Sequence, residues 1–173
     1  MPKLLEDYSW NGNFWLDQYG KAANTWRSLA LGKVFLDDFF QGPHCDWPAL
    51  CTRWRAAGLE SVSHASLQML SGACLVRLQT HDDIHTVLLL CQCFRQLGRT
   101  QMALQAAKSK LPSDHPELLT CYASLLCDTG RWSEAHQFIE RALQIRPSDA
   151  SRRVRYRILA HCAALGKSLA STG

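Results

Sequence analysis

The segment from Gly130 to Pro147, GRWSEAHQFIERALQIRP, places apolar residues three and four positions apart. The apolar positions are 132, 135, 138, 139, 142 and 143, and they form one face of an amphipathic helix. We expect the helix to begin just after Gly130, because glycine ends a preceding helix in the left-handed conformation without strain. We expect it to stop before Pro147, whose ring cannot continue the hydrogen-bond ladder.

A second apolar period lies immediately upstream, between His115 and Asp128, and Pro116 there suits the first turn of a helix. The region 115–145 is therefore predicted to be two helices joined by a tight turn at 129–131. Such helices pack closely only where small side chains let their backbones approach. Ala123 and Ala135 meet that need within the hairpin, and Ala142 does so against the next unit.

The segment 116–149 resembles a tetratricopeptide repeat, which is a helix–turn–helix unit of this length. The residues that carry the resemblance are Leu119, Tyr122, Ala123, Gly130, Trp132, Ala135, Ile139, Ala142 and Pro147. The segment 84–114 repeats the same order with Leu90, Cys91, Phe94, Gly98, Ala103 and Ala107. Its closing Pro112 comes early, so we expect the second helix of this repeat to be short.

The flanking regions extend this array. Region 44–80 has helical spacing and is interpreted as a degenerate first repeat that turns at Gly58. Ser148 and Asp149 are good N-caps for a capping helix over about 150–168. We expect an apolar stripe on that helix to face the repeats, comprising Val154, Ile158, Leu159, Cys162 and Leu165. The polar face that ends such an array would be formed by Arg152, Arg153, Arg155, Arg157 and Lys167.

Residues 1–43 do not fit the repeat pattern and are predicted to be an aromatic-rich amphipathic helical extension. Its candidate docking residues are Trp15, Tyr19, Trp26, Phe39 and Phe40. The predicted fold is all-α, a tetratricopeptide-like superhelix of stacked antiparallel helix hairpins over 44–173 that follows this extension.

The resemblance implies that the first helix of each hairpin lines a concave groove. The expected groove residues are His85, Leu88, Gln92, Arg95, Thr120, Ser124, Cys127, Val154, Ile158 and His161. This mixture of apolar and uncharged polar side chains suits an extended peptide or an amphipathic helix. Tetratricopeptide co-chaperones that bind acidic tails hold them with Lys and Asn on the inner helices. At the matching positions of this chain only Arg155 could take such a role, so we expect no clamp of this kind.

Other chemistry has weaker support in the sequence. His81 and His85, four residues apart in HDDIH, could chelate zinc, but the glutamate of HExxH is missing and the aspartates between them suit a helix start. No GxSxG elbow is present. We therefore expect no enzyme, no metal and no cofactor, and keep a metal-dependent enzyme using this pair as the least favoured alternative.

Charge and hydropathy restrict the partners. A net charge of +4 is too mild to indicate nucleic acid by itself, and we interpret the RRVRYR cluster as a solvated face rather than a phosphate site. No apolar run reaches the ~20 residues that span a bilayer. The eight cysteines form no CxxC pair, and we expect reduced thiols in a cytoplasmic protein.

The chain also resembles, over about 60–168, the small tetratricopeptide chaperones of bacterial type III secretion, which hold export subunits before secretion. The expected function is therefore protein binding, foremost as a chaperone for a helical or extended partner. The alternative is a structural adaptor in a larger assembly that docks through its N-terminal helix. The partner and the oligomeric state are left open by the sequence.

Overall fold

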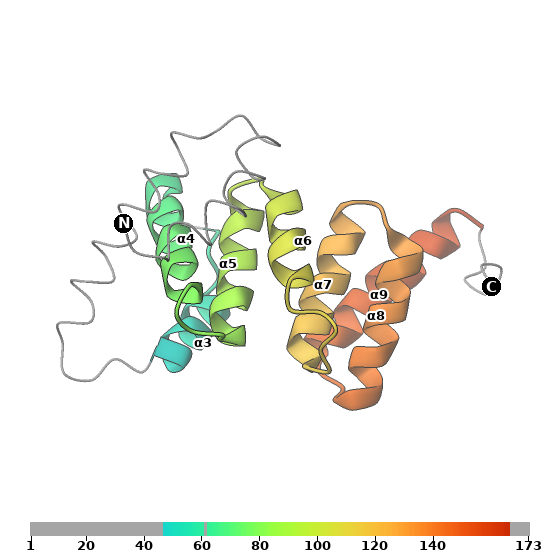
Figure 1. The fold of residues 1–173 in the computed structure, drawn as a ribbon. Coiled ribbons are helices and arrows are strands. Elements are labelled where there is room, and N and C mark those ends of the chain that lie inside the picture. Colours follow the sequence, from blue (N-terminus) through green and yellow to red (C-terminus); the bar gives the residue numbers. More distant parts are fainter. Residues whose placement is uncertain (1–46, 61, 167–173) are drawn as a thin grey trace. The chain divides into compact units, whose positions relative to one another are not determined.

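The structure is a computed structural model, and it describes residues 47–60 and 62–166. Within these residues it has seven helices and no strand, so the predicted all-α class is confirmed for this part of the chain. The helices are α3 (Trp47–Ala57), α4 (His64–Leu78), α5 (Ile84–Gln96), α6 (Thr100–Lys108), α7 (Pro116–Asp128), α8 (Trp132–Ile145) and α9 (Asp149–Ala164). Figure 1 shows them in chain order.

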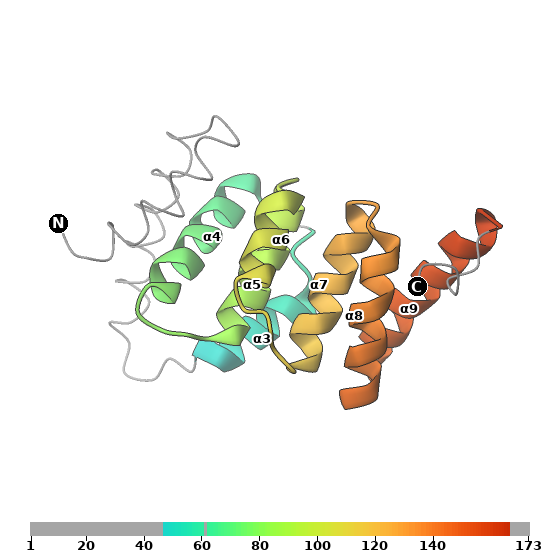
Figure 2. The same cartoon turned by 45° about the vertical axis from the view of Figure 1, so that its right-hand side comes forward.

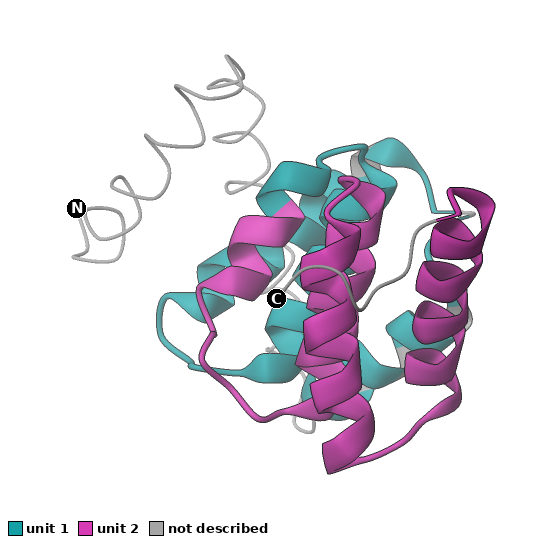
Figure 3. Ribbon diagram, turned by 90° about the vertical axis from the view of Figure 1, so that its right-hand side faces the viewer, with its two compact units in different colours: residues 1–102 teal, residues 103–173 magenta. Residues whose placement is uncertain are grey.

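The chain divides into two compact units, residues 1–102 and residues 103–173, which Figure 3 colours separately. The division lies within α6. The boundary that the sequence predicts between residues 43 and 44 lies outside the described residues and stays a prediction.

In the first unit, α5 packs against both α3 and α4. Eight of the nine positions from Thr86 to Phe94 in α5 are buried, and the ninth, Gln92, is half-buried. A helix covered on two sides needs an apolar surface wider than one stripe. The buried residues of α5 are Thr86, Val87, Leu88, Leu89, Leu90, Cys91, Cys93 and Phe94.

In the second unit, α7 packs against α8 and α9, and α8 also packs against α9. Figures 1 and 2 show α7 and α8 side by side. Ala123 and Ala135, the small residues predicted at this contact, have no exposed surface. The ring of Tyr122 meets Phe138 edge-on, with the ring centroids 4.8 Å apart. The α7–α8 hairpin is thus formed as the sequence pattern predicts.

The same hydrogen-bonded turn ends both α5 and α7. Gly98 has φ +70° and Gly130 has φ +77°, the left-handed region that only glycine enters without strain. The N–H of Gly98 donates to the carbonyl of Arg95 (3.0 Å), and the next N–H donates to the carbonyl of Phe94 (2.7 Å). The turn at Gly130 forms the two equivalent bonds, at 3.1 and 2.9 Å. Both are Schellman motifs, which satisfy carbonyls that the end of a helix leaves unpaired.

The helix starts also agree with the sequence. Ser148 caps α9, and its side chain accepts from the backbone N–H of Ser151 at 3.1 Å, while the Ser151 hydroxyl accepts from the N–H of Ser148 at 2.9 Å. Pro116 is the first residue of α7. The helix before Pro147 ends at Ile145, and α6 is short, as predicted from the early proline at 112.

The predicted apolar stripe of α9 is only partly buried. Ile158 has no exposed surface, whereas Leu159 is 42% and Leu165 is 53% exposed, which corrects the expectation that both face the repeats. The stripe is wider than the contact, because α7 and α8 cover one side of α9 and bury only Ser151 and Ile158 completely.

Candidate partner-binding surface

On α5, the four residues predicted to line a groove differ in their exposure. His85 and Gln92 are half-buried and Arg95 is exposed. Leu88 is only 2% exposed, so its assignment to the groove surface is wrong. The side chain lies in the core because α3 and α4 both pack on this helix.

On α7, Ser124 is half-buried, whereas Thr120 and Cys127 are buried. The Thr120 hydroxyl donates to the carbonyl of Pro116 at 2.8 Å, so its own helix satisfies it. Thr120 and Cys127 therefore offer no open surface to a partner, and their assignment to the groove is corrected.

On α9, Ile158 is buried and Val154 is half-buried. The ring of His161 stacks on Trp132 of α8, with centroids 3.8 Å apart and planes 15° apart. The guanidinium of Arg157 lies 5.6 Å from the centre of the same indole ring. His161 thus takes part in the contact between α8 and α9.

The residues that keep accessible surface are fewer than the sequence predicts. In the first unit they are His85, Gln92 and Arg95, and in the second unit they are Ser124, Val154 and part of the stacked His161. The candidate docking residues Trp15, Tyr19, Trp26, Phe39 and Phe40 lie outside the described residues.

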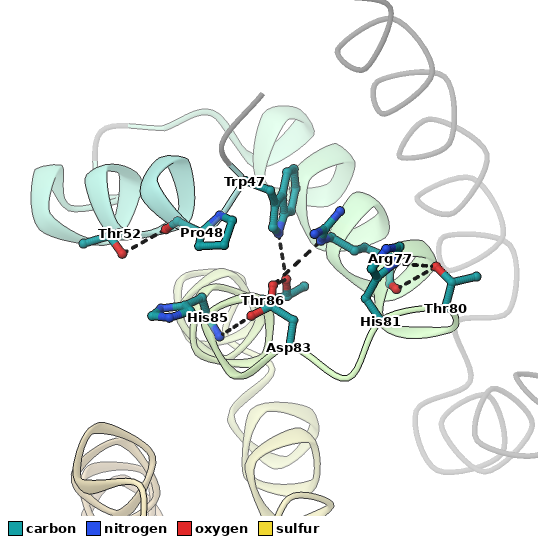
Figure 4. A network of polar contacts seen from close by, with 9 residues as sticks. All are labelled: Trp47, Pro48, Thr52, Arg77, Thr80, His81, Asp83, His85 and Thr86. Atoms are coloured by element: carbon teal, nitrogen blue, oxygen red, sulfur yellow. Dashed lines mark hydrogen bonds and ion pairs between the residues drawn. The ribbon is translucent and has the colours of Figure 1, made fainter. Parts of the chain in front are cut away.

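A partly buried polar network joins α3, α4 and α5 (Figure 4). The indole N–H of Trp47 donates to the Thr86 hydroxyl at 2.7 Å, and that hydroxyl donates to a carboxylate oxygen of Asp83 at 2.6 Å. The other oxygen of Asp83 caps α5 by accepting from the backbone N–H of His85 at 2.9 Å. Arg77 lies 3.7 Å from the carboxylate and 5.1 Å from the centre of the Trp47 ring. The network orients α3 and α4 on the start of α5.

The two histidines of HDDIH do not form a chelating pair. Figure 4 shows the rings of His81 and His85 on opposite sides of Asp83, pointing away from each other. The Nδ1 of His81 shares a hydrogen bond of 2.7 Å with the Thr80 hydroxyl. The predicted capping role of the aspartates is confirmed for Asp83. Among the described residues, no cluster of three or more His, Cys, Asp or Glu is arranged to hold a metal ion.

Among the described residues of the first unit, four cysteines lie in the core: Cys51, Cys74, Cys91 and Cys93. Burial, and to a lesser degree the negative charge of Asp83, raises the pKa of Cys51 to about 12. Burial likewise raises the pKa of Cys93 to about 12 and that of Cys74 well above its ordinary value. Thiols that stay protonated are poor nucleophiles and poor metal ligands, so these cysteines act as the small apolar side chains that the sequence predicts.

A surface that the sequence analysis did not identify lies on α9. Tyr156 is 75% exposed, and Leu159, Ala160 and Ala163 are exposed beside it. We call these four residues the outer face of α9. One signal in the sequence could have found it: α9 has more apolar positions than a helix covered on one side can bury.

Comparisons with known proteins leave the family open. Models of protein families, curated proteins and solved structures were compared with the chain, and none matches. In the part of the chain that the structure describes, no helix is both long enough and apolar enough to cross a membrane. Inferences about function therefore rest on the residues and their geometry.

Proposed function

We propose that the chain is a protein-binding module of the tetratricopeptide kind that holds a helical or extended segment of a partner protein. The observation that supports this most is the identical Schellman turn at Gly98 and Gly130, because a repeated turn between paired helices is what a helix–turn–helix array requires. The packing of α7 against α9 adds to it, since these would be the first helices of successive units.

The accessible residues on these first helices suit such a partner. Ser124 and Val154 of the second unit are uncharged and half-buried, so a segment bound there would meet short polar and apolar side chains rather than a charged cluster. Backbone hydrogen bonds and apolar anchors are the usual means of recognition on such surfaces. A chaperone of this kind covers an apolar stripe of its partner that would otherwise drive aggregation.

Site-specific crosslinking in the native cytosol tests the proposal. A photoreactive phenylalanine analogue is placed singly at Ser124 or Val154, and at the exposed Gln137 of α8 as a matched control. We expect one polypeptide to crosslink at Ser124 and at Val154 and not at Gln137. Equal crosslinking at all three positions, or none at the first two, would refute a groove on α7 and α9.

The identity of the crosslinked partner separates the classes of binding protein. A single small exported or aggregation-prone protein would support a chaperone like those of type III secretion. Several subunits of one stable complex would support the adaptor alternative, which the aromatic stripe within 1–43 favours. A chain lacking residues 1–40 that stays folded but loses those subunits would assign the docking to the N-terminal segment.

A further inference from the structure

The outer face of α9 is a continuous apolar strip on a helix that is otherwise rich in charge. Tyr156, Leu159, Ala160 and Ala163 follow the spacing of three, four and seven that brings side chains to one face of a helix. The buried Ser151 and Ile158 lie on the opposite side, where α7 and α8 pack. Isolated exposed apolar residues are common on protein surfaces, whereas a contiguous strip indicates an interaction site.

The composition of the strip indicates a helical ligand. Tyr156 and Leu159 provide two large anchors, and the alanines at 160 and 163 leave room for another backbone to approach closely. Helix–helix contacts use this combination of large anchors beside small residues. A nucleic acid strand would need successive aromatic platforms and cations along its whole path. The part of the strip that follows Leu159 consists of Ala160 and Ala163 and provides neither.

Charge determines which kind of helix fits. Arg155 pairs with Glu140 at 2.7 Å and Arg157 pairs with Asp128 at 2.8 Å, so the chain itself neutralises these two guanidinium groups. Arg152 and Arg153 stand beside the N-terminal end of the strip and are exposed.

The arginines at that end have little compensation from their own chain. Arg152 lies 3.3 Å from Asp149, but this pair is 67% and 88% exposed and therefore weak. Within the described part of the chain, the partner of Arg153 is a backbone carbonyl, that of Asp149, at 3.3 Å. Asp149 is the single acidic residue of α9. A partner covering the strip would thus bring its own surface against a net positive end.

A second α9 helix does not supply the missing acids. If two α9 helices packed in parallel on their outer faces, Arg152 and Arg153 would face the same arginines. If they packed antiparallel, these arginines would face the end around Ala163 and Gly166, which has no acidic residue. Like charges placed opposite each other at an interface disfavour the wrong partner, so charge disfavours the pairing of two copies through α9.

We propose that the outer face of α9 binds an amphipathic helix of another protein, whose apolar stripe carries acidic side chains at the end that meets Arg152 and Arg153. This surface is separate from the groove residues of the proposed function. Two large anchors bury little area compared with a standard interface, so we expect a dissociation constant on the order of micromolar.

Fluorescence anisotropy with defined peptides tests the proposal on the full chain. The probe is a labelled amphipathic helical peptide with leucines on one face and glutamates on the other, and its matched control has lysines in place of the glutamates. We expect the acidic peptide to bind at least tenfold more tightly than the basic one. Failure of the acidic peptide to bind, or equal binding of both peptides, would overturn the proposal.

Variants locate the binding to α9. Tyr156→Ser combined with Leu159→Ser should weaken binding at least tenfold, and Arg153→Glu should weaken it several-fold. The controls are Ile145→Ser, which removes a similarly exposed apolar residue from α8, and Lys108→Glu, which makes the same charge change on α6. Both should bind as the original chain does. All these positions are exposed, and circular dichroism checks that each variant is folded.

Two further measurements address the rival occupants. Tighter binding of a single-stranded oligonucleotide than of the acidic peptide, lost in Arg153→Glu, would overturn the proposal in favour of nucleic acid. Analytical ultracentrifugation that finds a dimer in the original chain and a monomer in the Tyr156→Ser, Leu159→Ser variant would overturn it in favour of self-association. If the double variant Tyr156→Ser, Leu159→Ser binds the acidic peptide as tightly as the original chain does, the site lies elsewhere and the role of α9 is refuted.

Discussion

The two glycine turns allow a quantitative test of whether they are energetically equivalent. Gly98→Ala and Gly130→Ala each place a side chain on a residue with φ +70° or +77°. A Cβ built at either position meets no atom within 4 Å, so crowding contributes nothing to the effect. The whole effect should come from the backbone conformation.

That conformation sets the magnitude. A left-handed residue with a side chain costs about 1–2 kcal/mol, and the smaller backbone freedom of alanine in the unfolded chain offsets about 0.4–1 kcal/mol of this. We therefore expect each variant to lose about 1 kcal/mol of folding free energy, and both to lose the same amount. Asparagine, which tolerates the left-handed region better, should lose less at either position.

Urea unfolding followed by far-ultraviolet circular dichroism measures these losses, together with the thermal midpoint. A loss of 1 kcal/mol lowers the midpoint by about 2–4 °C in a domain of about 150–250 residues. A variant with unchanged stability would show that its residue is not left-handed. A loss above about 3 kcal/mol at either position would mean that the added methyl group clashes with a neighbour, which would contradict the open space around that glycine. Unequal losses at the two glycines would refute the equivalence of the turns.

Two substitutions and one labelling experiment test packing, capping and burial. Ala135→Arg should destabilise the chain by more than about 3 kcal/mol, because it places an unpaired charge and excess volume in a fully buried contact. Ala150→Arg on the exposed side of α9 is its control in the same urea titration, and similar losses for both would refute close packing of α7 on α8. Ser148→Ala removes the capping box of α9 and should lower the free energy of unfolding by about 1 kcal/mol. An unchanged urea midpoint would show that the cap does not stabilise the chain. In the folded chain at mildly alkaline pH, the Cys93 thiol should resist alkylation while the half-buried Cys162 reacts, because burial raises the pKa of Cys93 to about 12 and thiolate is the reactive form. Peptide mass spectrometry reads this difference, and prompt labelling of Cys93 would contradict its burial.

Much of the local structure could be predicted because its causes lie within a few residues. The cap at Ser148, the first-turn Pro116, the left-handed Gly130 and the helix end before Pro147 each depend on neighbouring backbone groups, which the sequence specifies directly. The burial of Ala123 on α7 and of Ala135 on α8 was also predictable, since only small residues at these spacings allow two helices of a hairpin to approach.

The burial of individual groove candidates was not predictable from periodicity. Leu88 and Ile158 occupy the positions that a first helix would turn toward a groove, but each lies in the core. The spacing of apolar residues indicates that a helix has an apolar face; it does not indicate how many neighbouring helices cover that face. On α5, the neighbours α3 and α4 cover a surface wider than one apolar stripe, so that even Thr86 is buried. Its hydroxyl is satisfied there by hydrogen bonds with Trp47 and Asp83.

The sequence by itself determined the helices, their ends and the positions where small residues are needed, because these follow from hydrogen bonding and sterics over a few residues. Only the tertiary structure decided which apolar side chains are covered. Leu159 and Ile158 are adjacent in the sequence and similar in hydrophobicity, but the contact with α7 and α8 buries Ile158 and leaves Leu159 42% exposed. Burial depends on contacts between residues distant in the chain, and the side of α9 that those contacts leave open is the surface that we propose for an acidic helix.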